Sequence, residues 1–595
     1  MLFGKYINKY YKKYAIFFII GVIALILVDY FQLEIPKICG NIIDGVSTGT
    51  IFEEENSNQM LKYMLYLGLI AFIMFTGRFA WRYSIFGVAA RIEADMRDEM
   101  FSHSLKLSNQ YYKEHKVGQL MALLTNDLQT IKRTFGSGTI FLIDAVFLGS
   151  IALFKMIRLN WLLALLSLIP MMLILGISLL VGKVMEQKYK LTQEAYDDLS
   201  DFAQENFSGI SVIKAFVKEV FEIKEFAKLN KKNYDRNISF FRSSVLLDVL
   251  LTAVISLIIA LLIGGGSYFV INESIFFGSK FTSGRLFEFI GYFSSLVWPI
   301  LAVSMLIQMR AQGVASYKRI EEFLDSKIDI VDDNVEEIDD IKGKIEFKHL
   351  NFKYPDGSNL ALEDITFKID EGMMVGIVGR TGCGKTTIVD LLLRTYNVDN
   401  QSLFIDDKDI MHIPFKKVRD SIGYVPQDNF LFSDTIANNI GFFAEDELDE
   451  ASIEEAAKLA SVHDNIIEFE KNYSTVLGER GVTLSGGQKQ RVSIARALIK
   501  NPAILIFDDS VSAVDTDTES KILSNLRAVR QGKTTIMIAH RISTVETLDM
   551  IVLMDEGKVI DVGTHNELLE RSALYQQMVH LQELEKEVGG EQNEK

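Results

Sequence analysis

The stretch that decides the fold of this chain is Met374-Val-Gly-Ile-Val-Gly379-Arg-Thr-Gly-Cys-Gly-Lys385-Thr386-Thr387. Its apolar start predicts a buried strand over 374–378, and the residues from Thr387 onward predict a helix, so a glycine-rich loop lies between the two. Glycines let backbone N–H groups converge on a phosphate, and the N-terminus of a helix favours negative charge. The stretch therefore predicts an α/β domain that binds a nucleotide.

Each residue of this loop is a candidate nucleotide contact. Lys385 is expected to reach the β- and γ-phosphates, and the hydroxyl of Thr386 is expected to bind Mg²⁺. The candidate contacts are Gly379, Arg380, Thr381, Gly382, Cys383, Gly384, Lys385, Thr386 and Thr387.

Two later stretches add to the predicted site. The apolar run 503–507 ends in Asp508 and Asp509, and a carboxylate at the end of a buried strand is placed to hold Mg²⁺ through water. Leu484-Ser485-Gly486-Gly487-Gln488 precedes the predicted helix 489–498 and forms a second anion-binding helix start. One chain needs only one phosphate cradle for each ATP. Two cradles far apart in sequence suggest that one serves a nucleotide held mainly by another chain.

The first half of the chain carries six apolar runs long enough to span a membrane, which takes roughly 17–25 residues. They cover residues 14–31, 61–86, 139–156, 161–181, 245–271 and 287–307. The connections between the second and third and between the fourth and fifth runs are long and charged. Their heptad-like patterning predicts helices that continue out of the membrane for ~40 Å.

The charges that flank the first run predict its orientation. Lys5, Lys9, Lys12 and Lys13 precede it, whereas the loop 44–59 holds no Lys or Arg. The positive-inside rule then places the N-terminus in the cytoplasm. The first run is too long for the core of a cleavable signal peptide and lacks a small-residue cleavage site, so we expect no signal peptide.

Length, composition and charge limit the number of domains, the kinds of partner and the use of disulfides. With 595 residues the chain is too long for one core, and we expect a membrane domain (1–325), a linker (326–342), a nucleotide-binding domain (343–580) and a polar tail (581–595). The net charge of -16 argues against nucleic acid as a partner. Its two cysteines, Cys39 and Cys383, form no disulfide framework.

Ionisable residues inside predicted spans are costly and are candidates for function. They are Asp29, Arg78, Arg82, Asp144 and Asp248. Two interpretations stay open for each of them: pairing or contact with water near the interface, or direct contact with a transported substrate.

The order of the motifs along the chain resembles the ABC transporter superfamily. The glycine-rich loop, Gln427, the Leu-Ser-Gly-Gly-Gln sequence, Asp508, Ser512-Ala-Val-Asp515 and His540 follow one another as they do there. Six spans with long cytoplasmic extensions look like its exporter branch, in the arrangement called type IV. The match covers essentially the whole chain. It implies an α-helical transmembrane domain fused to an α/β P-loop ATP-binding cassette, with ATP and Mg²⁺ as cofactors.

The resemblance also implies roles for single residues. Tyr354 is similar to the aromatic residue that stacks on adenine in this family. Gln427 is similar to the family's Q-loop glutamine, which senses Mg²⁺ and contacts the membrane half. His540 resembles the switch histidine, and residues 485–488 would bind the γ-phosphate of an ATP seated in a partner subunit. Three further stretches resemble an exporter X-loop (478–481) and the regions around the two coupling helices (109–115 and 207–216).

Asp509 departs from the family pattern, in which a glutamate usually polarises the attacking water. Aspartate is one methylene shorter, so its carboxylate lies roughly 1 Å further back, and such a displacement can lower a rate ~100-fold. Either the backbone adjusts and the site hydrolyses ATP normally, or Asp509 lies in a degenerate site that holds ATP. The intact signature favours the second interpretation, because heterodimeric exporters divide the altered acid and the good signature in this way.

The resemblance therefore implies a subunit of a heterodimeric ABC exporter in the inner or plasma membrane. Its partner is expected to carry the catalytic glutamate and an imperfect signature. The expected substrate is small and amphipathic, and a preference for cations rests on Asp29, Asp144 and Asp248 alone. A homodimeric lipid or peptide exporter and a nucleotide-gated channel or regulatory protein remain as alternatives.

Overall fold

The computed structural model of this chain divides into two compact units. One consists of Met1–Ser104 and Val117–Ser326, and the other of Leu105–Lys116 and Lys327–Lys595. We call them the membrane unit and the nucleotide unit. The structure describes residues 4–52, 58–336, 338, 340–444, 449–478, 481, 483–510 and 515–593. The segment Leu105–Lys116, which follows the second predicted span, thus groups with the nucleotide unit.

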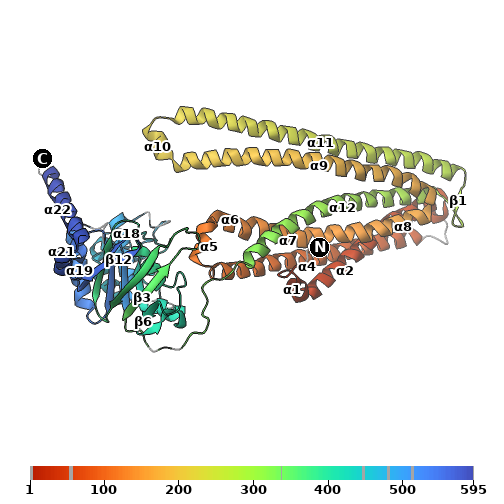
Figure 1. Cartoon of the computed structure of the whole chain (residues 1–595). Coiled ribbons are helices and arrows are strands. Elements are labelled where there is room, and N and C mark those ends of the chain that lie inside the picture. Colours follow the sequence, from red (N-terminus) through yellow and green to blue (C-terminus); the bar gives the residue numbers. More distant parts are fainter. Residues whose placement is uncertain are drawn as a thin grey trace. The chain divides into compact units, whose positions relative to one another are not determined.

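The membrane unit is built from long helices (Figure 1). In chain order its helical elements are α1 (Asn8–Lys13), α2 (Ala15–Gln32), α3 (Glu34–Ser47), η1 (Thr50–Phe52), α4 (Gln59–Ser104), α6 (Val117–Ala122), η3 (Leu123–Asp127), α7 (Leu128–Ile143), η4 (Asp144–Leu148), α8 (Gly149–Leu159), α9 (Trp161–Ser208), α10 (Ile210–Ala215), α11 (Glu219–Ile271) and α12 (Ser283–Leu324). The short strands β1 (Ile275–Phe276) and β2 (Ser279–Lys280) pair between α11 and α12. The elements η3 and η4 are π-helical, and α9 and α11 run side by side.

Among the described residues, five stretches are helical, long and apolar enough to cross a membrane. They are Ala15–Ser47, Gln59–Ser104, Val117–Leu159, Glu219–Ile271 and Ser283–Leu324. The remaining predicted span, 161–181, falls in α9, where the described apolar run Trp161–Met172 is shorter. Large apolar side chains such as Ile16, Phe72 and Phe75 are exposed on these helices, as expected for surfaces that face lipid.

Polar residues begin two of these helices and join α3 to α12. Where α9 begins, the side-chain oxygen of Asn160 accepts a hydrogen bond from the backbone N–H of Leu163 at 3.0 Å. Thr282 begins α12, and its hydroxyl donates to Asp44 of α3 at 2.5 Å. Asp44 also accepts from the backbone N–H of Gly284 at 2.7 Å. A Cβ at Gly284 would lie 2.0 Å from a carbonyl oxygen of α3, so this close approach requires glycine.

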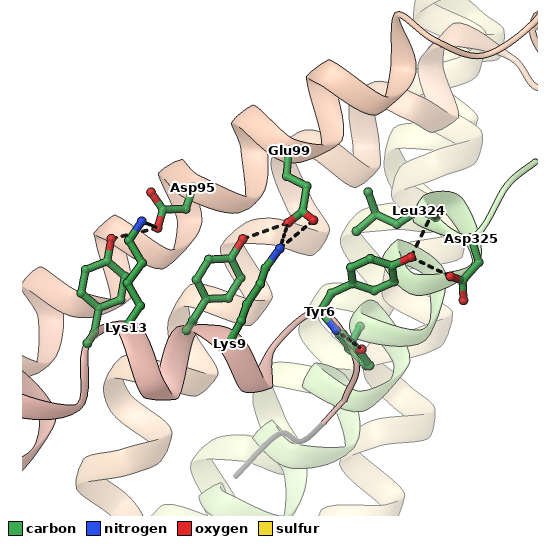
Figure 2. Close-up of polar contacts among 10 residues, drawn as sticks. Tyr6, Lys9, Lys13, Asp95, Glu99, Leu324 and Asp325 are labelled. Atoms are coloured by element: carbon green, nitrogen blue, oxygen red, sulfur yellow. Dashed lines mark hydrogen bonds and ion pairs between the residues drawn. The ribbon is translucent and has the colours of Figure 1, made fainter. Parts of the chain in front are cut away.

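The N-terminal segment is held by three repeated contacts, which we call the lysine–tyrosine ladder; Figure 2 shows them without Lys5. In each rung a lysine and the tyrosine that follows it share one carboxylate, at distances of 2.5–3.0 Å. The rungs are Lys5 and Tyr6 on Asp325, Lys9 and Tyr10 on Glu99, and Lys13 and Tyr14 on Asp95. The lysines recur every four residues, which is one helical turn, so the same face meets α4 and the end of α12.

The nucleotide unit contains two sheets. Its strands are β3 (Ile345–Phe352), β4 (Leu362–Ile369), β5 (Met374–Gly379), β6 (Leu403–Ile405), β7 (Lys408–Asp409), β8 (Ile422–Val425), β9 (Ile504–Asp508), β10 (Thr534–Ile538), β11 (Met550–Asp555) and β12 (Lys558–Gly563). The larger sheet has the order β12-β11-β5-β10-β9-β8, in which β8, β9, β10, β5 and β11 are parallel. The smaller sheet is antiparallel, with the order β4-β3-β6-β7. Every residue of β9 and β10 is buried, as a parallel sheet covered on both faces requires.

Helices complete this unit. They are α5 (Asn109–Glu114), α13 (Lys385–Leu392), α14 (Phe415–Ser421), α15 (Ile436–Ile440), α16 (Glu450–Leu459), α17 (His463–Ile467), α18 (Gly486–Ile499), α19 (Thr516–Val529), α20 (Ile542–Val545), α21 (His565–Arg571) and α22 (Ala573–Asn593), with 3₁₀ turns η5 (Ile410–His412) and η6 (Asn472–Ser474). The predicted fold class, a helical membrane part fused to an α/β nucleotide-binding part, is confirmed.

Candidate functional site

Neighbouring parallel strands bring most of the candidate residues to one edge of the larger sheet, the edge formed by the carboxyl ends of these strands. The glycine-rich loop follows β5, Gln427 follows β8, Asp508 and Asp509 follow β9, and His540 follows β10. The register pairs Val425 of β8 with Phe507 and Ile538 of β10 with Asp508, so these strands end side by side. Ligands of open α/β sheets bind at the carboxyl ends of the strands.

The glycine-rich loop bends sharply into α13. Gly382 and Gly384 have φ angles of +82° and +99°, which favour glycine. The Lys385 side chain is only 6% exposed and curls back over the loop. Its ammonium donates to the carbonyl oxygens of Gly379 (2.9 Å) and Arg380 (3.0 Å). The positive charge therefore already lies over the backbone that is expected to meet phosphate.

Asp508 is a buried carboxylate of the site that is fixed by hydrogen bonds. It is 2% exposed and accepts from the hydroxyls of Thr386 (3.2 Å) and Tyr424 (3.4 Å). Burial raises the pKa of Asp508, and the two hydroxyl donors act against that rise. Tyr424 was not predicted from the sequence, although a hydroxyl near the end of β8 is a signal that could have suggested it.

Asp509 and His540 face each other at this edge. Asp509 has a φ of +47°, and its backbone N–H donates to the carbonyl of Ile538 at 3.0 Å. Its Oδ2 lies 3.8 Å from Nε2 of His540, whose side chain is 39% exposed. The geometry brings a carboxylate and an imidazole together where solvent can reach the histidine.

Gln582 of α22 supports His540 through the backbone. Its amide nitrogen donates to the carbonyl of His540 at 2.6 Å, and its amide oxygen accepts from the N–H of Ile542 at 2.7 Å. Nothing in the sequence near Gln582 indicated this contact, because the two segments lie about forty positions apart and meet only in the folded unit.

Tyr354 lies against the helix that follows the loop. Its hydroxyl is 2.9 Å from the Thr387 hydroxyl, and its ring packs edge-on against those of Phe352 and Tyr396. The ammonium of Lys113, from α5, lies 5.0 Å from the centre of the Tyr354 ring and donates to the Tyr396 hydroxyl at 2.8 Å. That hydrogen bond raises the pKa of Lys113. Residues 109–115 were expected to form a coupling region, but the sequence did not single out Lys113.

The signature residues begin a separate helix. Ser485 caps α18, since its hydroxyl accepts from the N–H of Gln488 at 3.3 Å and its own N–H donates to the Gln488 side chain at 2.9 Å. Ser485 and Gly486 are exposed, whereas Gly487 is partly buried. Within the described residues, no hydrogen bond or ion pair joins residues 485–488 to the glycine-rich loop. Residues 479 and 480 of the predicted X-loop and residues 512–514 of the stretch Ser512-Ala-Val-Asp515 lie outside the described residues.

The predicted ionisable residues of the membrane unit separate into two groups. Asp29, Arg78 and Asp144 line one cavity. Arg82 instead stacks its guanidinium 5.2 Å from the centre of the Trp81 ring, and Asp248 is exposed on α11.

Comparison with known protein families gives two matches. Residues 18–300 match the model described as "ABC transporter transmembrane region", and residues 362–512 match the model described as "ABC transporter". The first segment runs from α2 into α12, and the second covers the glycine-rich loop, Gln427, the signature, Asp508 and Asp509 but ends before His540.

Curated relatives match almost end to end. The chain is 34% identical over 586 residues to the "Probable multidrug resistance ABC transporter ATP-binding/permease protein YheI" of Bacillus subtilis, covering 98% of this chain and 97% of that protein. It is 34% identical to the "Multidrug resistance-like ATP-binding protein MdlA" of Escherichia coli, covering 98% and 96%. It is also 33% identical to the "ATP-dependent lipid A-core flippase" of Syntrophus aciditrophicus, covering 91% and 89%.

A solved structure shares the fold. It is that of a bacterial Atm1-family ABC exporter with ATP bound, which is 27% identical and superposes with a TM-score of 0.77. The match covers 96% of this chain and 98% of that one.

Proposed function

The chain belongs to the ABC transporter family, and from this premise we propose that it is the degenerate-site subunit of a heterodimeric multidrug exporter. It is a multi-pass membrane protein and an ATPase coupled to transport, as its relatives and its ATP-binding domain establish. The proposal concerns which of the two exporter subunits this chain is, which substrate it transports and what its individual residues do.

One observation carries the proposal: Asp509 stands at the end of β9 beside His540, while the signature on α18 is intact and capped. A shorter carboxylate reaches less far toward a water molecule at the γ-phosphate. The signature, in contrast, has the serine, the two glycines and the exposed helix start that an anion requires. This chain therefore supplies the loop of a slow ATP site, and its intact signature completes the ATP site on the partner subunit.

Binding of ATP at this chain's own loop follows from the residues present. The N–H groups of the loop and the Lys385 ammonium would hold the phosphates, and the Tyr354 ring would stack on adenine. For this the Lys385 ammonium must exchange the carbonyls of Gly379 and Arg380 for phosphate oxygens. The family resemblance supplies these roles, and the preformed loop supports them.

The residues also fit a magnesium ion. The hydroxyl of Thr386 and the carboxylate of Asp508 lie 3.2 Å apart, and hard oxygen ligands of this kind suit Mg²⁺. Among the described residues no group of three or more His, Cys, Asp or Glu could hold a metal ion, so the remaining ligands would come from phosphate, water and Gln427. When bound, the ion supplies charge neutralisation at the phosphates.

In the proposed mechanism, the ATP-binding cassettes of the two subunits close around ATP. This closure switches the two membrane halves between inward- and outward-facing states, and the substrate is transported. Residues 105–116 support this coupling, because they group with the nucleotide unit while the chain continues on both sides into helices of the membrane unit. A change at Tyr354 would reach Lys113 through direct contact and would then pass along the chain.

Multidrug relatives support a small amphipathic substrate, and the lipid A-core flippase supports a lipid as the second candidate. A homodimeric lipid or peptide exporter, or a channel, would use the same scaffold. ATP-dependent uphill transport in vesicles distinguishes a pump from a channel. Accumulation of dyes, as opposed to labelled lipid or peptide, identifies the cargo.

The degenerate site is tested by comparing ATPase rates of this chain alone and with its partner subunit. We expect the pair to be at least ~10-fold faster, and the Asp509→Glu variant to raise the rate of this chain's own site. A lone chain that hydrolyses as fast as the pair would show that Asp509 is competent and that no partner is needed.

A further inference from the structure

A cavity of about 310 Å³ inside the membrane unit is lined by residues of α2, α4, α7, η4 and α12. Two carboxylates line it, Asp29 of α2 and Asp144 at the start of η4, together with Arg78 of α4. Asp29 is 4% exposed and Asp144 is 6% exposed. The same cavity is lined by Trp81 of α4 and Trp298 of α12.

The hydrogen bonds around this cavity are incomplete. The indole N–H of Trp298 donates to Oδ2 of Asp144 at 2.8 Å. Oδ1 of Asp144, Oδ2 of Asp29 and the indole N–H of Trp81 are buried and have no hydrogen-bond partner among the described residues. No ion pair within 4 Å joins Arg78 to either carboxylate in the described part of the chain.

Such an arrangement costs free energy and is retained only for a reason. A buried polar group without a partner costs roughly 1–3 kcal/mol, and a charge inside a membrane costs more. Asp144 also begins the π-helical element η4, and single π-turns within helices occur frequently at functional sites. The unused acceptors therefore point to a ligand that supplies donors or positive charge.

The lining of the cavity indicates the class of that ligand. A bare metal ion is too small for this volume and would be left against two tryptophans, whereas pockets for organic molecules start at about 300 Å³. Arg78 offsets one of the two carboxylate charges, so the lining has a net charge of −1 when both acids are ionised. Indole rings favour flat apolar groups and attract cations.

We propose that the Asp29–Asp144 cavity is a binding site for a monovalent aromatic cation. The ligand's charge lies between the two carboxylates, and its ring system contacts Trp81 and Trp298. This inference rests on the proposed export of small amphipathic molecules and identifies both their charge class and one place where they bind. It also separates the two cavity acids from Asp248, which is exposed on α11.

The test measures binding of ethidium and of its uncharged parent, 3,8-diamino-6-phenylphenanthridine, to the full-length chain in lipid nanodiscs at pH 7.5. The two dyes share their ring system and differ in the N-ethyl group that gives ethidium its fixed positive charge. For Asp29→Asn and Asp144→Asn we expect ethidium to bind at least 10-fold more weakly and the uncharged parent to change by less than ~3-fold, because only the charge contact is lost. Asparagine at 144 retains an oxygen that accepts from Trp298.

Three further variants make the result specific. Asp248→Asn makes the same charge change on the exposed face of α11 and should leave both dyes unchanged. Asp29→Glu keeps the charge and should bind ethidium within ~3-fold of the parent chain. Arg78→Gln removes the offsetting charge and should bind ethidium several-fold more tightly, a change of opposite sign that misfolding cannot produce.

Several results would overturn the proposal. They are an equal loss of both dyes in the Asp→Asn variants, no loss of either dye, or a loss of ethidium binding in Asp248→Asn as well. A change only in the pH dependence of uncharged-dye transport would assign the carboxylates to protons instead. Binding of ATP and the elution volume of each variant report whether it is folded.

Transport assays keep this proposal distinct from the proposed function. If the unmodified chain with its partner expels neither dye when given ATP, the proposed export function fails, even where the binding differences stand. If it expels both and the Asp→Asn variants lose neither preferentially, the exporter stands and the cation site fails.

Discussion

The membrane unit exposes many large apolar side chains on its helices, whereas the strands of the nucleotide unit bury theirs. In the nucleotide unit, strands β9 and β10 are buried along their whole length and carry mainly apolar residues. In the membrane unit, Ile16, Phe72 and Phe75 are exposed, whereas Asp29 and Asp144 are buried. A surface that faces lipid needs no polar covering, so apolar side chains can lie outside and ionisable ones inside.

Asp508 and the two acids of the membrane cavity also differ in their partners. Asp508 accepts from two hydroxyls, whereas Oδ2 of Asp29 and Oδ1 of Asp144 have no hydrogen-bond partner among the described residues. Asp508 thus finds its hydrogen-bond donors within the nucleotide unit. The difference teaches that a buried acid of a candidate site can be held by hydroxyl donors of the protein, as Asp508 is, or can keep an unused acceptor that faces a cavity, as Asp29 and Asp144 do.

The largest effect is expected from Lys385→Ala in the nucleotide unit. Removing the ammonium takes away the charge that meets the phosphates, and we expect ATP to bind ~100-fold more weakly, since charge-assisted hydrogen bonds contribute about 1.5–3 kcal/mol. Equilibrium binding of a fluorescent ATP analogue measures this. Lys558→Ala, which removes an exposed lysine on β12, is the control and should change little. A loss below ~3-fold would mean that the backbone of the loop holds the phosphates alone.

Replacing an acid with leucine should change stability in opposite directions in the two units. Asp29→Leu removes a buried carboxylate with an unused acceptor and should raise the melting temperature by a few degrees, equivalent to about 1–3 kcal/mol. Asp508→Leu leaves the hydroxyls of Thr386 and Tyr424 without their acceptor and should lower it. Thermal unfolding without ATP checks both variants. A lower melting temperature for Asp29→Leu would show that Asp29 stabilises the membrane unit, contrary to the comparison.

A pH effect of intermediate size is expected at Asp390, on α13. Burial raises the pKa of Asp390 to about 6, and the nearby Lys113 acts against the rise. Because the folded pKa exceeds the unfolded value of about 3.9, the stabilisation is complete below pH ~4 and is lost as the pH rises through 6. Asp390→Asn should remove this loss, about 1–2 kcal/mol after solvent screening.

Melting curves of the parent chain and Asp390→Asn between pH 5 and 7.5 measure that difference. Lys113→Met should move the midpoint of the loss to a higher pH, because the opposing charge is gone. Parallel curves for the parent chain and Asp390→Asn would exclude Asp390 as the titrating group.

The smallest effect is expected in the lysine–tyrosine ladder, where the carboxylates of the membrane unit are paired and partly exposed. Lys9→Met removes an ion pair whose lysine is 46% exposed and should cost less than about 1 kcal/mol. Tyr10→Phe removes a donor to Glu99 from a buried tyrosine and should cost more, about 0.5–1.5 kcal/mol. Hydrogen exchange of residues 4–14 distinguishes the two. A larger effect for Lys9→Met would mean that the charge, and not the buried hydroxyl, holds the segment.

The sequence by itself determined the features that depend on neighbouring residues. The strand, the glycine-rich loop and the helix of the nucleotide unit follow one another within 374–392, so their pattern could be read directly. Apolar runs of spanning length and the capping pattern Ser485-x-x-Gln488 are local in the same way. Local backbone chemistry is sufficient to predict such elements.

Only the tertiary structure decided which distant residues meet. It brought Asp29 and Asp144 to one cavity and left Asp248 outside, although all three acids had equal standing in the sequence. It placed Lys113 on Tyr354 and Gln582 beside His540. Each residue turns a helical side chain by about 100°, so the face on which an acid lies depends on small differences in position. Its partner then depends on how helices far apart in the chain pack together, which no local pattern records.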